Sequence, residues 1–177
     1  MSITSDQLRK IWTHAPIDRC ATYAPLLSDA MAKFEIDTPE EIVEFLAQIS
    51  HESAEGRYTL EIASGQAYEG RKDLGNTQPG DGVRYKGRGL IQCTGRINYL
   101  LMGMLLDLDL IAHPELLEQP QYACLSAAAF WWNHKLDDLA VKKNFIAVTK
   151  VINGGTNGLA DRQAYLVLAR KVIPGAA

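Results

Sequence analysis

The sequence lacks an apolar run long enough to cross a lipid bilayer, and it has no internal repeat, linker or low-complexity tail. Residues 1–6 do not show the basic-then-apolar order of a secretory signal peptide. The chain has 177 residues, of which 47% are hydrophobic, so it can bury a proper core. We therefore predict a single domain over residues 1–177, made without an export signal and not stably inserted in a membrane.

Cysteine and histidine are also scarce. Cys20, Cys93 and Cys124 are odd in number and stand among apolar residues, so we predict reduced thiols in a cytoplasmically made protein. A zinc motif built on His51 would need a second histidine four residues later, where the chain has Glu55. The other histidines show no ligand spacing, and we expect no metal or other cofactor.

The charged residues are distributed unevenly, although the net charge is only −3. Residues 35–61 contain eight acidic residues and one basic residue, a balance of −7, whereas residues 71–96 contain six basic and two acidic residues, a balance of +4. This pattern fits either two oppositely charged walls of a cleft or two separately solvated surfaces. Because the whole chain is acidic and contains no recognition motif, nucleic acid is not an expected partner.

An amphipathic helix that ends in a glutamate is predicted over residues 38–54. Thr38 and Glu41 have the spacing of a capping box, and Pro39 suits the first helical position. At about 100° per residue, Glu52 lies on the flank of the apolar stripe. A carboxyl group half removed from water keeps its proton more readily, as a general acid requires. The apolar positions of this helix are Ile42, Phe45, Leu46 and Ile49.

Most of the remaining chain also shows helical patterns. Glycine and proline interrupt residues 62–92, which we expect to form a small loop or hairpin lobe beside the site. The segment 123–132 is apolar nearly all round, which predicts a central buried helix. Other helices are expected near residues 8–12, 23–34 and 95–107, and on both sides of residues 153–158.

Five short motifs occur in order between residues 40 and 165, at positions 47–53, 87–92, 98–99, 152–155 and 161–162. Each is weak alone, but the ordered set resembles the family 19 glycoside hydrolases, which include plant-type chitinases and peptidoglycan-cleaving endolysins of bacteriophages. The resemblance implies a mainly α, lysozyme-like fold. We expect a two-lobed helical domain with a small glycine-rich lobe and a central substrate groove.

Glycoside hydrolysis needs one protonated carboxyl group and one ionised carboxylate. The resemblance assigns Glu52 as the acid and favours Glu61 over Glu69 as the second carboxylate, because Glu61 has the endolysin-like spacing. In one continuous helix Glu52 and Glu61 would be about 13 Å apart along the axis, beyond the roughly 6.5–9.5 Å of an inverting pair. We therefore expect a bend near Gly56, and we expect the unused glutamate to pair with an arginine of the lobe.

The resemblance also implies roles around the substrate. Gln92 and Asn98 are expected to bind it, and Thr94 stands where a hydroxyl helps to hold the attacking water. Arg162 resembles the arginine that orients the second carboxylate. Asn153 fits either a contact to an acetamido sugar or a loop-stabilising residue.

Three further residues near these motifs receive no role in the chemistry. Glu55 follows Glu52 by three positions, but no motif gives it a function, so we expect an exposed glutamate at a helix end. Trp131 and Trp132 are expected in the core rather than as a platform for a sugar.

Together these features predict an endolysin that hydrolyses β-1,4-glycosidic bonds of bacterial peptidoglycan by general acid–base catalysis and so lyses the host cell. It would act as a monomer on glycan strands, without a separate wall-binding domain. It would collect in the host cytoplasm and reach the periplasm and cell wall after a separate holin opens the membrane. The alternative is a chitinase acting on chitin oligomers, and a rival of another class is a non-catalytic glycan-binding module.

Overall fold

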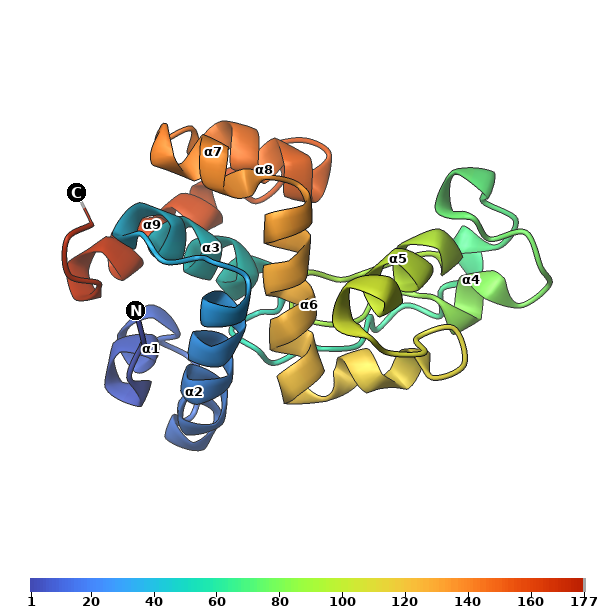
Figure 1. Ribbon diagram of the computed structural model, residues 1–177, viewed down its shortest axis with the longest axis horizontal. Helices are drawn as coiled ribbons and strands as arrows, with labels where there is room; N and C mark the ends of the chain where they lie inside the picture. Colours follow the sequence, from blue (N-terminus) through green and yellow to red (C-terminus); the bar gives the residue numbers. More distant parts are fainter. Residues whose placement is uncertain (177) are drawn as a thin grey trace.

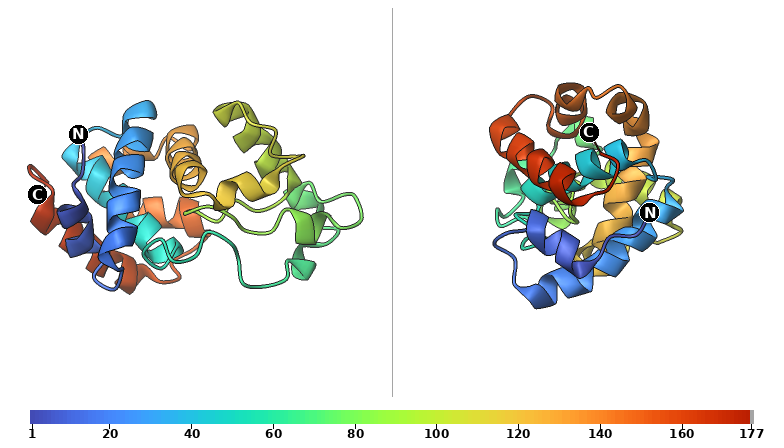
Figure 2. Two further views of the ribbon diagram at one scale, coloured as in Figure 1. Left: turned by 90° about the horizontal axis from the view of Figure 1, so that it is seen from below. Right: turned by 90° about the vertical axis from the view of Figure 1, so that its left-hand side faces the viewer.

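The computed structural model describes residues 1–176, which form a helical body and a loop-rich lobe on either side of helix α6 (Figure 1). Both termini lie in the body, and the lobe extends away from it (Figure 2). The body consists of α1 (Ser5–Ile11), α2 (Ile17–Lys33), α3 (Pro39–Glu52), α6 (Pro120–Asn133), α7 (Leu136–Val141), α8 (Phe145–Asn153) and α9 (Leu159–Val172). The loop lobe, residues 60–118, contains η1 (Gln66–Tyr68), η2 (Lys72–Leu74), α4 (Asp81–Arg84), α5 (Arg96–Leu106) and η3 (Pro114–Glu118). The predicted mainly α architecture is confirmed.

Helix α3 begins at the predicted capping box. The Thr38 hydroxyl accepts a hydrogen bond from the Glu41 backbone, and the Glu41 carboxylate accepts one from the Thr38 backbone at 3.0 Å. Pro39 occupies the first helical position, where its missing N–H costs nothing. Residues 41–50 are buried throughout, because α9 packs along one side of α3 and the core covers the rest. The end of α3 is therefore held firmly, which matters for Glu52.

Helix α6 connects the two parts of the molecule. It packs against α2 on the body and against α5 and η3 on the lobe, so its burial on most sides agrees with its apolar sequence. Trp131 is buried and contacts Phe45 edge to face, with ring centroids 5.6 Å apart. Trp132 is 48% exposed, so its predicted place in the core is wrong. It is the next residue along α6, and its ring contacts Phe34 at the end of α2 while about half of the side chain stays in solvent.

The loop lobe contains no β-strand within the described residues, only isolated bridges from Leu60 to Arg88 and from Arg88 to Cys93. Polar contacts hold it together instead. Arg96 pairs with buried Asp81 at 2.5 Å and lies over the Tyr85 ring at 4.8 Å. The loop alternative of the prediction is therefore confirmed, and the hairpin alternative is not.

The basic residues of segment 71–96 mostly fix the lobe's own loops. Arg71 pairs with Asp73, Arg88 pairs with Glu118 at 2.7 Å, and Arg84 donates to the carbonyl groups of residues 111 and 112. These arginines therefore form contacts inside the lobe and do not form a basic wall that faces the body. No helix within residues 1–176 combines the length and the apolar character that a membrane span demands.

Candidate active site

Glu52 is the last residue of α3, and its side chain is 17% exposed. One carboxylate oxygen accepts a hydrogen bond from Nη2 of Arg162, whose side chain is fully buried. The expected apolar flank is present, but an arginine also contacts the group. The arrangement fixes the direction of the Glu52 carboxylate while it leaves one side of it open to solvent.

Arg162 is fixed in turn by a chain of buried polar side chains. Its Nη1 donates to the Gln48 side chain at 2.6 Å, and Gln48 donates to the Thr149 hydroxyl at 2.8 Å. Helices α3, α8 and α9 each supply one part of this network. The prediction that Arg162 orients the second carboxylate is wrong, because the first turn of α9 lies against the last turn of α3 and its partner is Glu52.

After Glu52 the chain reverses its direction through three consecutive residues with left-handed backbone. Ala54, Glu55 and Gly56 have φ values of 47°, 61° and 68°. At Gly56 a side chain would also collide with the buried Trp12 ring, since a Cβ there would be 2.8 Å from it. The predicted bend is confirmed, and it breaks the helix that would have held Glu61 too far from Glu52.

The same bend turns Glu55 inward, so its predicted exposure is wrong. Its side chain is 3% exposed. It accepts hydrogen bonds from the His14 backbone N–H at 2.7 Å and from the Tyr165 hydroxyl at 3.0 Å. Glu55 thereby ties the bend to α9 and to the segment after α1, a role that helical periodicity could not reveal.

Glu61 lies at the start of the loop lobe and receives two hydrogen bonds. The Gly87 backbone N–H donates to one carboxylate oxygen at 2.9 Å, and the Tyr68 hydroxyl donates to the other at 3.0 Å. Burial and the neighbouring Glu61 raise the pKa of Tyr68 above its usual value. The phenol therefore keeps its proton at neutral pH and remains a donor to Glu61.

Three predicted site residues converge around Gly87. A Cβ at this position would be 2.6 Å from Oε1 of Gln92, 3.1 Å from Oε2 of Glu61 and 3.3 Å from Oγ1 of Thr94. Only glycine leaves room for all three groups. The loop lobe therefore places an acceptor, a hydroxyl and an amide around one point, as the activation of a water molecule requires.

Glu69 lies elsewhere in the loop lobe, and its carboxylate accepts two backbone hydrogen bonds. They come from Gly80 at 2.6 Å and from Gly82 at 2.8 Å. The expected arginine partner is wrong, because Arg71 pairs with Asp73 instead. With both oxygens engaged, Glu69 stabilises the turn at residues 80–82.

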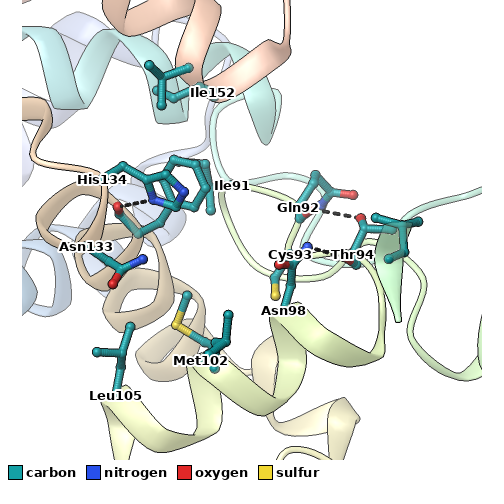
Figure 3. Close-up of a pocket in the computed structure, with 14 residues that line it drawn as sticks. Ile91, Gln92, Cys93, Thr94, Asn98, Met102, Leu105, Asn133, His134 and Ile152 are labelled. Carbon is teal, nitrogen blue, oxygen red and sulfur yellow. Dashed lines mark hydrogen bonds between the residues drawn. The ribbon is translucent and has the colours of Figure 1, made fainter. Parts of the chain in front are cut away.

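A cavity of about 320 Å³ lies where α5, α6 and α8 meet the loop at residues 91–94 (Figure 3). Gln92, Thr94 and Asn98 line one side of it, as expected of substrate-contacting residues. Asn98 donates to the Thr94 carbonyl at 2.7 Å, and the Thr94 hydroxyl donates to the Gln92 carbonyl at 2.9 Å. Glu52 and Glu61 are not among its lining residues, so Gln92 and Thr94 connect the cavity to Glu61.

The opposite side of the cavity comes from α6 and was not anticipated. The His134 ring stacks on Phe130 with centroids 3.9 Å apart, and its Nδ1 is 2.9 Å from the Phe130 carbonyl oxygen. A carbonyl can only accept, so Nδ1 carries the proton and Nε2 is left as the second polar atom of the ring. Met102 and Leu105 supply apolar surface between the two sides (Figure 3).

The loop between α8 and α9 borders the same region. Asn153 ends α8 next to Ile152, which lines the cavity. Its Oδ1 atom is buried and has no hydrogen-bond partner within residues 1–176. His51 contacts Asp161 at 2.6 Å and packs against Gly158, which holds this loop to the end of α3. Asn153 itself is not among the residues that line the cavity.

Within residues 1–176 the structure brings no three histidine, cysteine, aspartate or glutamate side chains close enough to hold a metal ion.

Comparisons with known proteins point to one family. The profile of the family described as class I chitinases, glycoside hydrolase family 19, matches residues 30–165. The endochitinase At2g43610 of Arabidopsis thaliana is 36% identical over 115 residues, which cover 65% of this chain and 40% of the relative. A glycosyl hydrolase family 19 domain-containing protein of Haemophilus influenzae is 35% identical over 102 residues, 58% of this chain and 49% of that protein. The chain thus spans less than half the length of these relatives.

Solved structures share the fold. Chitinase C from Streptomyces griseus superimposes with a TM-score of 0.77 at 21% identity, over 97% of this chain and 76% of that one. A bacterial family 19 chitinase gives 0.72 at 19% identity, over 94% of each chain. The lysozyme-like architecture expected from the sequence is therefore confirmed.

Proposed function

The chain belongs to glycoside hydrolase family 19, and we propose that it hydrolyses β-1,4-glycosidic bonds of an aminosugar polymer by general acid–base catalysis. One observation carries the proposal: Glu52 ends a rigid helix of the body, while Glu61 stands on the loop lobe among Gly87, Gln92 and Thr94. Two carboxylates held by separate parts of a molecule can act on opposite faces of one sugar ring.

Glu52 is the proposed acid. Its proton goes to the leaving glycosidic oxygen as the bond to the anomeric carbon breaks. The product of that step is a carboxylate next to Arg162, which always carries a positive charge. The arginine thus stabilises the form of Glu52 that appears during the reaction, and Gln48 keeps it in place.

Glu61 is the proposed base, with Glu69 as the weaker candidate. A water molecule adds to the anomeric carbon and gives a proton to Glu61. Tyr68 and the Gly87 N–H leave the carboxylate only limited freedom to turn. The Thr94 hydroxyl, which borders Gly87 as the Glu61 carboxylate does, is the proposed second partner of that water.

Substrate binding is proposed for the cavity beside these groups. Gln92 and Asn98 offer amides on one side, and Asn153 offers a buried, unpaired oxygen near the other. An acetamido group has one N–H donor and one carbonyl acceptor, so it suits a site rich in amides. N-acetylated sugars, in chitin or in peptidoglycan, are therefore the substrate class.

Within this class we infer bacterial peptidoglycan as the substrate and host cell lysis as the result, with release through a holin and action in the periplasm and cell wall. The three cysteines support synthesis in the cytoplasm, because Cys20, Cys93 and Cys124 are buried and unpaired. Chitin is the second candidate, and it is favoured by the relatives that carry the name endochitinase.

The two substrates separate in one experiment. The purified chain is added to permeabilised Gram-negative cells and, in parallel, to chitin oligomers, with Glu52→Gln as the inactive control. Clearing of the cells by the wild type alone, with new reducing ends in muropeptides by mass spectrometry, supports the endolysin. Cleavage of chitin oligomers alone supports the chitinase, and cleavage of neither overturns the proposal.

A further inference from the structure

A second cavity, of about 480 Å³, lies where the C-terminal ends of α2 and α6 meet the start of α7. Its aromatic residues are Phe34, Trp131 and Trp132, and the ring centroids of Phe34 and Trp132 are 6.5 Å apart at an angle of 53°. Trp132 is one of the large apolar side chains that the fold leaves in water. Only the indole of Trp132 is open to solvent, because Phe34 is buried beside it and carries the ammonium group of Lys33 over its ring, 5.7 Å from the ring centroid.

The rim of this cavity is polar and carries both signs of charge. Glu35, Lys135 and Asp137 line it, and none of the three forms an ion pair with another of the described residues. Lys135 and Glu35 both have left-handed backbone, with φ values of 52° and 57°, and each stands just after the C-cap residue of a helix, α6 and α2 respectively. Their side chains are thus available as donors and acceptors around the rings.

The second cavity adjoins the first through one residue. Asn133 lines both, and it is exposed at the end of α6 between His134 of the first cavity and Trp132 of the second. Figure 3 shows its amide directed toward the first cavity, near Met102. Within residues 1–176 the side chain of Asn133 has no hydrogen-bond partner. A chain-like ligand can therefore pass from the first cavity over Asn133 to Trp132.

We propose that Trp132 and Asn133, with Phe34 packed beside the indole, form an outer binding site for a glycan strand whose next units occupy the first cavity. The proposal rests on the function proposed above. Sugar rings have flat apolar faces that stack on an indole, while their hydroxyl and acetamido groups bond to the amide and to the charged rim. An occupant without a strong net charge also suits a rim with both signs of charge.

Such a site acts by holding the polymer close to the enzyme. A strand bound at Trp132 raises the local concentration of its neighbouring units at the catalytic groups, without any new contact to the scissile bond. The site therefore affects long substrates and leaves short ones alone. This length dependence distinguishes it from a residue that only supports the fold.

The test compares Trp132→Ala with the wild type on two kinds of substrate. One is the insoluble polymer, peptidoglycan or chitin, and the other is a soluble tetramer of N-acetylglucosamine. We expect a rate about fivefold to tenfold lower on the polymer at concentrations below saturation, because the variant loses the gain in effective concentration. The rate on the tetramer should not change. Trp132→Tyr should keep most of the polymer rate. Met104→Ala on α5, which also removes a large exposed side chain (74% exposed), is the matched control and should change neither rate. Equal losses on both substrates, or no loss on the polymer, overturn the proposal.

A binding measurement separates this proposal from the function proposed above. In the Glu52→Gln variant, labelled with ¹⁵N, the indole signal of Trp132 is followed during titration with hexamers of N-acetylglucosamine and with solubilised glycan strands. We expect it to shift with long ligands and not with dimers, even if the wild type hydrolyses neither substrate. Shifts at Gln92 and Asn98 without any at Trp132 would remove the outer site and leave the catalytic proposal standing.

Discussion

Glu52 and Glu61 are held in contrasting ways. Glu52 is fixed by side chains that come from three helices of the body, with Arg162 110 residues away in sequence. Glu61 is fixed inside the loop lobe by Tyr68, seven residues away, and by the backbone of Gly87. One group therefore depends on the packing of the core, and the other depends on the shape of a few loops.

Different interactions would therefore support the proposed proton donor, Glu52, and the proposed proton acceptor, Glu61. A fixed guanidinium next to Glu52 favours the charge that develops when an acid gives up its proton. The Glu61 carboxylate is instead held in position by a phenol and a backbone amide, without a neighbouring cation. The following predictions test this division, starting with the largest expected effect.

Glu52→Gln should lower kcat by about 10³-fold, because the variant keeps the shape and an acceptor for Arg162 but cannot deliver a proton. Hydrolysis of peptidoglycan or chitin oligomers, with circular dichroism as the check on folding, measures it. Gln48→Glu is not a suitable control because it adds a charge to the buried network. Met104→Ala, on exposed surface far along α5, serves instead. A Glu52→Gln enzyme with wild-type kcat would remove the proposed acid.

Glu61→Gln should lower kcat by about 10²-fold, whereas Glu69→Gln should lower it less than threefold. Glu69 accepts two backbone hydrogen bonds, so its loss should instead reduce the free energy of unfolding by about 1–2 kcal/mol. Kinetics and thermal melts are measured on both variants side by side, so that each variant serves as the control for the other. The reverse order of kcat would transfer the base role to Glu69.

The sequence predicted the helical body better than the loop lobe, for a physical reason. Helix α3 follows a capping box and an apolar period, both of which act within a few residues. Helix α7 was missed because it is six residues long and begins after Lys135 without a side-chain cap. The lobe depends on contacts such as that of Arg96 with Asp81, which no local pattern specifies.

The site shows the same limit. The motifs located Glu52 and Glu61 and the residues around Gly87, but they did not give the partner of Arg162. Gln48 left a readable signal that was overlooked, since it is a polar residue one turn before Glu52 in a buried helix. Trp132 left none, because exposure at the end of an apolar helix depends on where the neighbouring helices stop.

Glu44 sharpens the contrast within the body, because it lies on the same face of α3 as Glu52 but has no arginine bonded to it. It is fully buried, and neither carboxylate oxygen has a hydrogen-bond partner among residues 1–176. Burial, and then the nearby Glu40, raise its pKa from 4.5 to about 8, although Arg170 acts in the opposite direction. Glu44 is thus a buried acid that stays neutral at pH 7.

Replacement of Glu44 should therefore change how stability depends on pH. Between about pH 4.5 and 8 the unfolded chain releases this proton and the folded chain keeps it, so the free energy of unfolding falls as the pH rises. Glu44→Gln should remove this pH dependence. Its gain in the free energy of unfolding over the wild type should therefore be larger at pH 8 than at pH 5, by roughly a few kcal/mol. Urea denaturation at both values measures it. The control is Glu115→Gln at an exposed site, whose free energy of unfolding should stay within about 0.5 kcal/mol of the wild-type value. A stability gain of Glu44→Gln that does not grow with pH would contradict a buried, neutral Glu44.

Tyr68→Phe tests how Glu61 is held in the loop lobe, and we expect a smaller effect on kcat than from replacing either glutamate. Loss of one hydrogen bond to a charged group should lower kcat by about tenfold and leave KM unchanged, because Tyr68 contacts Glu61 and not the cavity. Burial and Glu61 raise the pKa of Tyr68, so the wild-type phenol stays protonated and the ratio of the two kcat values should be constant from pH 5 to about pH 9. Tyr58→Phe, on an exposed ring beside Arg57, is the matched control and should have no effect. If instead KM rose and kcat held, Tyr68 would bind substrate, and Glu61 would keep its position through the Gly87 backbone alone.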